Sequence, residues 1–234
     1  MISPAFESFA HSLRIMVEVN ERSHKLLLLD PHEAAGNIEQ AVTQVLNAFH
    51  SFYDSSKDEA AFDWYGTVET ATILAVRNAR HHNIANRIRG LYAYHLQLPN
   101  PQNPSSYVYV DYPEAEDAGY TFDIPISWFD MNQMLHLPSE EVRLKNKIQQ
   151  SILDYLDEQK MNNYAAGYNV PNEHIFFNSV PLIVNALIKL MPILRGYIKP
   201  ESVEAETFAD LYKYVLPSKT HRHVVNTFTL ALPA

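Results

Sequence analysis

The sequence of 234 residues contains no cysteine and only six glycines. Without cysteine, the chain has no disulfide bond, thiolate nucleophile or cysteine-ligated metal centre. Neither the Walker pattern nor the dinucleotide-binding glycine pattern occurs, so a phosphate site built on a glycine-rich loop is not expected. The longest apolar run, residues 179–194, is interrupted by Asn185 and Lys189 and is shorter than the roughly 18 apolar residues of a membrane span. With no secretory signal pattern either, we expect a cytoplasmic protein that does not enter a membrane.

Acidic residues are missing from one long window of an otherwise acidic protein. The chain has 27 Asp and Glu against 18 Lys and Arg, a net charge of −9, which argues against a surface coated in nucleic acid. Residues 70–110 nevertheless contain no Asp or Glu and hold four of the nine arginines. A basic window of this kind predicts a local site for an anion, most commonly phosphate.

Hydrophobic periodicity predicts a mainly α-helical protein. Apolar residues recur at helical spacing in the first third of the chain and again after residue 139. Between them, a proline-rich connection leads to β-branched and aromatic segments that predict a hairpin, with Pro125 favouring an edge position for the second strand. The tail predicts a strand added to that hairpin. The expected helices are 6–29, 32–53, 67–77, 84–96, 139–159, 173–190 and 201–215, and the expected strands are 107–112, 120–128 and 223–232.

We therefore expect a helical bundle with a small β-hairpin insertion and a C-terminal strand. The first region, 1–98, forms a helical bundle, and 99–138 holds the proline-rich connection and the hairpin. The last region, 139–234, supplies helices that complete the same domain.

The centre of the acid-free window is the string RNARHH, residues 77–82. An arginine there binds phosphate through a charged, bidentate contact. A histidine exchanges a proton near neutral pH. Together these two groups suffice for RNA cleavage without a metal, because the histidine removes the 2′-hydroxyl proton and the arginine stabilises the charged transition state. Arg77 and His82 lie about 140° apart around a straight helix, so they converge only if the helix ends or bends there, or if a second chain completes the site.

This string resembles the R-[N/H/D]-x-x-x-H motif of HEPN domains, which are α-helical bundles of prokaryotic toxin–antitoxin, abortive-infection and CRISPR-associated ribonucleases. The resemblance covers the six motif residues and the helices before them. It implies a dimer in which two motifs face each other and cleave RNA, with no metal or other cofactor. It also implies that Arg77 and His82 are catalytic and that Asn78 orients them.

Four further basic residues of the window are candidates for binding the RNA substrate: Arg80, His81, Arg87 and Arg89. Because His81 adjoins His82, the sequence leaves open which of the two histidines is catalytic and which binds substrate. A different use of the histidines is a metal site formed by His81, His82 and His95 with Glu69, or by the pair His221 and His223. A structural use is also open, with the arginines and histidines stabilising the C-terminal end of a helix.

The alternative to an enzyme is a non-catalytic interaction protein, such as an immunity, antitoxin or regulatory protein. The net negative charge suits capture of a basic partner. Aromatic residues of the predicted hairpin are typical both of strand packing and of interface cores. The two hypotheses differ in one observable, because only the first predicts cleavage of RNA by the purified chain.

Overall fold

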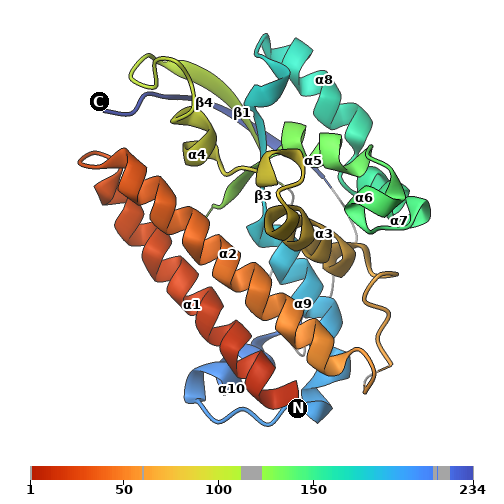
Figure 1. Ribbon diagram of the computed structural model, residues 1–234. Coiled ribbons are helices and arrows are strands. Elements are labelled where there is room, and N and C mark those ends of the chain that lie inside the picture. Colours follow the sequence, from red (N-terminus) through yellow and green to blue (C-terminus); the bar gives the residue numbers. More distant parts are fainter. Residues whose placement is uncertain (1, 60, 112–122, 213–214, 216–221, 234) are drawn as a thin grey trace.

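The computed structural model describes residues 2–59, 61–111, 123–212, 215 and 222–233. Within them the chain forms ten α-helices, three short 3-10 turns and four strands in one sheet. The prediction of a mainly helical protein with a small β insertion and a C-terminal strand is confirmed. Figure 1 shows the long helices beside one another, with the sheet at the end of the molecule that lies away from the N-terminus.

Two long helices at the start of the chain form the first layer. Helix α1 spans Ile2–Leu26 and helix α2 spans Pro31–Ser56, and they pack together along their length (Figure 1). The carboxylate of Asp30 accepts a hydrogen bond from the backbone N–H of Glu33, at 3.0 Å, and so caps α2. Proline is tolerated at the first position of a helix, where its missing N–H costs no hydrogen bond. The break between the two helices therefore lies before Asp30-Pro31, close to the one expected between 6–29 and 32–53.

Helices α3 (Val68–His82), α9 (Val180–Leu194) and α10 (Val203–Leu211) complete the bundle. Helix α3 packs against α2 and α9, and α10 packs against α1. Aromatic rings pack together at the α1–α2 contact, where the centroids of Phe9 and Phe49 lie 5.4 Å apart. The fully or almost fully buried aromatic residues of this core are Phe6, Phe9, Phe49, Phe52 and Trp64.

The sheet has the strand order β2-β3-β1-β4. Strand β1 (Ser105–Asp111) runs parallel to β3 (Ile175–Asn178) and antiparallel to β4 (Val224–Leu230), while β2 (Pro125–Ser127) pairs antiparallel with β3. The C-terminal strand is therefore present and pairs with the first strand, as predicted. Strand β2 is at the edge of the sheet, which agrees with the position expected for Pro125, a residue that has no N–H to donate.

The pairing predicted for the first two strands is corrected by this topology. Both segments form strands, but β3 lies between them, so they are not the two arms of a hairpin. The short β3 is buried throughout, and a central parallel partner cannot be recognised from the neighbouring sequence. Among the aromatic residues of the predicted hairpin, Tyr107, Tyr109 and Trp128 are buried. Tyr112, Tyr120 and Phe122 lie outside the described residues.

The predicted helix 173–190 is also corrected. Its first part is η2 (Asn172–His174) followed by β3, and α9 begins only at Val180. Pro181 lies in the first turn of α9, where a proline is tolerated, whereas in the interior of one continuous helix it would remove a hydrogen bond. Helix α9 and η3 (Arg195–Tyr197) together are long and apolar enough to span a membrane by composition, but 61% of this window is buried inside the fold. Helix α9 is therefore a core helix of the structure.

The predicted helix 139–159 is divided into α6 (Ser139–Val142), α7 (Asn146–Tyr155) and the start of α8 (Glu158–Tyr168). The first break is at Arg143, which has φ 57°, and the second is at Asp157, which has φ 50°. Burial explains the first break, because Val142 and Leu144 are both buried and residues two apart do not share a face of a helix. Asp157 caps α8, since its carboxylate accepts from the N–H of Lys160.

One hydrophobic cluster contains residues from all three regions outlined above, from Ile2 through Val108 and Met131 to Tyr212. The remaining helices are short. Helix α5 (Trp128–Leu135) begins where β2 ends and packs on β3, and α4 (Leu91–His95) precedes the proline-rich connection. The turn η1 (Ala85–Arg87) lies between α3 and α4, next to the RNARHH residues.

Candidate functional site

Helix α3 ends at the last residue of the RNARHH string. His82 is its last residue, and Asn83 follows in the left-handed conformation with φ 55°. Asparagine is one of the few residues that adopt this conformation readily, so it is a suitable helix terminator. The backbone N–H of Ile84 then donates to the carbonyl of Ala79 at 2.9 Å. The basic residues of the string lie in the last turns of α3, where the helix dipole favours positive charge.

Arg77 and Asn78 are half-buried neighbours near the end of α3. A guanidinium N–H of Arg77 donates to Oδ1 of Asn78 at 3.2 Å. No direct hydrogen bond joins Arg77 to His82 in the described residues, but the positive charge of Arg77 contributes to a lowered pKa of His82. Both residues lie within α3, which is continuous from Val68 to His82, so they remain about 140° apart around the helix and interact through charge alone.

His82 is exposed, and its closest polar partner comes from the second half of the chain. Nη1 of Arg143 lies 3.1 Å from Nε2 of His82. The ring of His81 is 4.7 Å from that of His82, at 76°. The pKa of His82 is lowered first by reduced contact with water and then by repulsion from Arg143, His81 and Arg77. Neutral imidazole, the form that accepts a proton, is therefore favoured near neutral pH.

A further histidine, His50 of α2, belongs to the same surface and was not singled out from the sequence. Its Nδ1 lies 3.2 Å from Oδ2 of Asp54. Burial lowers the pKa of His50 most strongly, and the positive charges of Arg77 and His81 lower it further. Helical spacing of Asp54 four residues after His50 was the available signal, but it is common on exposed helix faces. The structure thus groups Arg77, Asn78, His81 and His82 with two residues from elsewhere, His50 and Arg143.

Arg80 and Arg89, both proposed above to bind substrate, have their guanidinium groups engaged inside the fold. Arg80 is 5% exposed and donates to Oε2 of Glu39 at 2.7 Å and to the carbonyl of Ile88 at 2.8 Å. Arg89 makes a two-pronged contact with Asp130, which is fully buried, at 2.8 and 2.7 Å. These charges are compensated by carboxylates, so neither arginine is placed to bind an RNA phosphate.

The two buried pairs hold an unusual turn in the chain. Residues 85–88 all have positive φ, from 45° to 66°, although none is glycine. For Ala85, Arg87 and Ile88 this conformation costs about 1–2 kcal/mol each, whereas an asparagine such as Asn86 adopts it more readily. Asp130 accepts from the side chain of Asn86 at 3.1 Å and from the backbone N–H of Arg89 at 3.0 Å, and Glu39 accepts from the N–H of Gly90 at 2.8 Å. The helix predicted over 84–96 is therefore replaced by this turn and the short α4, and Arg87 is exposed on it.

The metal site considered for His81, His82 and His95 with Glu69 is not assembled in the structure, all four residues being described. No group of three or more His, Cys, Asp or Glu side chains among the described residues has the arrangement of a metal site. Glu69 is 1% exposed and binds Nζ of Lys189 at 2.7 and 2.8 Å. His223 lies 2.8 Å from the hydroxyl of Tyr164, while His221 lies outside the described residues.

His95 is a buried structural residue rather than a ligand or a catalytic group. Its Nε2 donates to the carbonyl of Pro101 at 2.7 Å, so its Nδ1 accepts from the hydroxyl of Tyr107, also at 2.7 Å. In the neutral ring, both nitrogens therefore have a hydrogen-bond partner. Burial is the main cause of its lowered pKa.

His95 is expected to make the protein less stable in mild acid. The unfolded chain takes up a proton on this side chain below about pH 6.5, whereas the folded state resists it, so stability is lost as pH falls through 6.5 towards the lower folded pKa. Each unit by which the folded pKa of His95 lies below the unfolded pKa corresponds to about 1.4 kcal/mol of folding stability. Urea unfolding at pH 7.5 and 5.0 should show a smaller acid-dependent loss for His95→Gln than for the wild type. Equal losses in the two proteins would contradict the buried neutral state of His95.

Comparisons of the chain with protein-family models, with curated proteins and with solved structures found no match. The resemblance to HEPN domains therefore rests on the RNARHH residues and their helical setting. Any function argued for this chain has to come from the site itself.

Proposed function

We propose that this protein is a HEPN-like, metal-independent endoribonuclease of the toxin or phage-defence type. The observation that carries the proposal is the placement of His82. It is exposed at the end of α3, its Nε2 accepts from an arginine, and the charged groups that shift its pKa are all basic. A neutral histidine surrounded by cations suits a substrate that brings negative charge and a proton to be removed.

The chemistry requires one proton transfer at His82. Nε2 takes the proton of a ribose 2′-hydroxyl while O2′ attacks the adjacent phosphorus. The bond from phosphorus to the 5′-oxygen breaks, and that oxygen leaves as a hydroxyl after taking a proton from water. Arg77 stabilises the negative charge that accumulates on the phosphate oxygens, and the hydrogen bond to Asn78 orients its guanidinium.

Of the four residues that the sequence suggested for binding the RNA substrate, two keep that role in the proposal. His81 and Arg87 are exposed and retain this proposed role, whereas Arg80 and Arg89 have a structural role in holding the turn. The resemblance also implies a homodimer in which a second copy faces the same surface. His82 is exposed in the single chain, so a second copy could contact the end of α3.

The alternative function, a non-catalytic module that binds a basic partner, has weaker support. The aromatic residues that favoured it are partly accounted for by packing, because Tyr107, Tyr109 and Trp128 are buried. What favours it is the net charge of −9 together with an apolar groove of about 470 Å³ between α1, α9 and α10. A pull-down that recovers one stoichiometric basic protein, without RNA cleavage by the chain, would support this alternative.

The test of the proposed function is cleavage of RNA by the purified protein in excess EDTA. We expect cleavage of a single-stranded RNA and none of the same sequence carrying 2′-O-methyl groups, since the attacking hydroxyl is then blocked. Loss of cleavage on adding EDTA, or equal cleavage of the methylated strand, would contradict the proposal.

A further inference from the structure

Arg143 lies at the break between α6 and α7, far from the RNARHH string in sequence. It has φ 57° and is exposed. Its two neighbours, Val142 and Leu144, are 2% exposed each, so the backbone is anchored on both sides of it. Helices α6 and α7 both pack against α3. The anchored turn therefore fixes the point from which the side chain of Arg143 reaches the end of α3.

The contact with His82 has a defined direction. A guanidinium group has only N–H donors, so in the 3.1 Å contact Nη1 of Arg143 donates and Nε2 of His82 accepts. Nε2 can accept only in the neutral ring whose proton is on Nδ1. Protonating Nε2 would remove this hydrogen bond and place two positive charges next to each other. Arg143 thus holds His82 in the form that a general base requires.

A guanidinium has five N–H donors, and this contact uses one of them. No carboxylate is paired with Arg143 in the described residues, in contrast to Arg80 and Arg89, whose charges are compensated by Glu39 and Asp130. Arg143 therefore retains donors and an uncompensated charge directly beside Nε2 of His82. A phosphate that takes up these donors would lie against the base.

We propose that Arg143 binds the scissile phosphate beside His82 and positions His82 in the free site. In the complex, the guanidinium shifts its donors to the phosphate oxygens, and Nε2 is left to accept the 2′-hydroxyl proton. This inference rests on the proposed ribonuclease function and extends it by giving the C-terminal half of the chain a part in the site.

The charged groups that face His82 come from two parts of the structure. Arg77 and His81 lie on α3 with it, and Arg143 comes from the turn after α6; all three lower the pKa of His82. Removing Arg143 removes one of these repulsions, so the pKa of His82 should rise towards its ordinary value near 6.5. Because the base must be deprotonated, the acidic limb of the pH profile of cleavage should move to higher pH.

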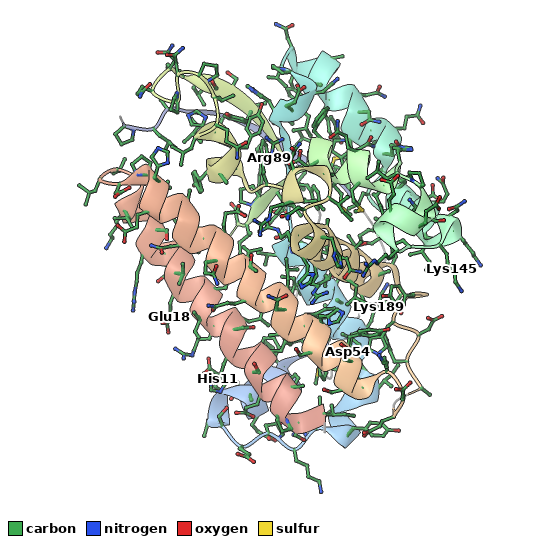
Figure 2. All side chains as sticks on the ribbon, viewed as in Figure 1. His11, Glu18, Asp54, Arg89, Lys145 and Lys189 are labelled. Carbon is green, nitrogen blue, oxygen red and sulfur yellow. The ribbon has the colours of Figure 1, made fainter. Side chains whose placement is uncertain are left out.

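The experiment compares wild type with Arg143→Ala and Arg143→Lys. Lys145→Ala is the matched control, because Lys145, labelled in Figure 2, is an exposed cation two residues from Arg143. No hydrogen bond joins Lys145 to His82 in the described residues. One measurement is kcat/KM for an RNA oligonucleotide across pH. The other is the NMR titration of the His82 ring, which needs neither RNA nor activity.

For Arg143→Ala we expect a loss of about 10- to 100-fold in kcat/KM, the effect of losing a charged hydrogen bond. We also expect a raised pKa of His82 and a pH profile shifted in the same direction, with partial recovery in Arg143→Lys. An unchanged His82 titration, or a loss of activity no larger than that of Lys145→Ala, would overturn the role of Arg143. Failure of wild type to cleave RNA would overturn the proposed function instead, while the titration would still report whether the contact exists.

Discussion

Replacing His82 with alanine is expected to lower kcat/KM for RNA cleavage by about 100- to 10,000-fold, the usual contribution of a positioned general base. The variant removes the acceptor nitrogen that Arg143 contacts and leaves the helix end otherwise intact, because the side chain is exposed. Thermal unfolding should therefore be nearly unchanged. The measurement is the initial rate of cleavage of a synthetic RNA in EDTA, with matched protein concentrations.

His81→Ala is the matched comparison for this prediction. His81 adjoins His82 on the same exposed end of α3, but no hydrogen bond joins it to Arg143 in the described part of the chain. We expect it to lose about ten-fold or less, as a residue that only helps to bind RNA. A larger loss for His81→Ala than for His82→Ala would reverse the roles of the two histidines.

Asp130→Asn is expected to lower the free energy of unfolding by about 3 kcal/mol, the effect of breaking a buried ion pair. Asp130 is fully buried and accepts from the guanidinium and the backbone N–H of Arg89 and from the side chain of Asn86. An amide presents one acceptor oxygen where the carboxylate presents two, and it leaves the charge of Arg89 uncompensated. The left-handed turn 85–88 would lose its main anchor at the same time.

Asp154→Asn provides the control for Asp130→Asn. Asp154 is exposed and accepts from the side chain of Gln150, so the same chemical change there should alter stability by less than about 0.5 kcal/mol. Urea unfolding of both variants measures the difference. A loss below 1 kcal/mol for Asp130→Asn would contradict the anchoring role of this residue.

The sequence predicted the parts of the fold that depend on local periodicity and capping. Helices α1 and α2 follow from a continuous apolar stripe, and the reversal between them follows from Asp30-Pro31, which serves as a cap and first turn. The edge position of β2 followed from Pro125. In each case the residues that determine the feature lie within a few positions of it, so the feature could be predicted without knowledge of the tertiary structure.

Features that depend on distant partners could not be predicted in this way. The turn 85–88 is stable only because Asp130 and Glu39, each about 40 residues or more from it, supply buried acceptors. The separation of the two predicted hairpin strands depends on β3, which arrives from the far half of the chain. Local propensity favoured a helix and a hairpin at these places, and tertiary contacts overrode it.

The sequence indicated where the candidate site lies but only some of the residues that the structure groups there. RNARHH and the acid-free window pointed to the end of α3, where His81 and His82 are exposed. The window did not separate these residues from Arg80 and Arg89, because their compensating acids lie outside it. Arg143 was missed because it lies between α6 and α7, about 60 residues from the RNARHH string, and an exposed arginine near Lys145 and Lys147 has no local feature that marks it as part of a site.

The most direct test of the central claim is identification of the ends that the protein leaves on a cleaved RNA in excess EDTA, with His82→Ala beside the wild type. Attack by the 2′-oxygen predicts a 2′,3′-cyclic phosphate on one fragment and a 5′-hydroxyl on the other, with both absent for the variant. Fragments ending in 3′-hydroxyl and 5′-phosphate, or cleavage that persists in His82→Ala, would contradict the assignment of His82 as the general base.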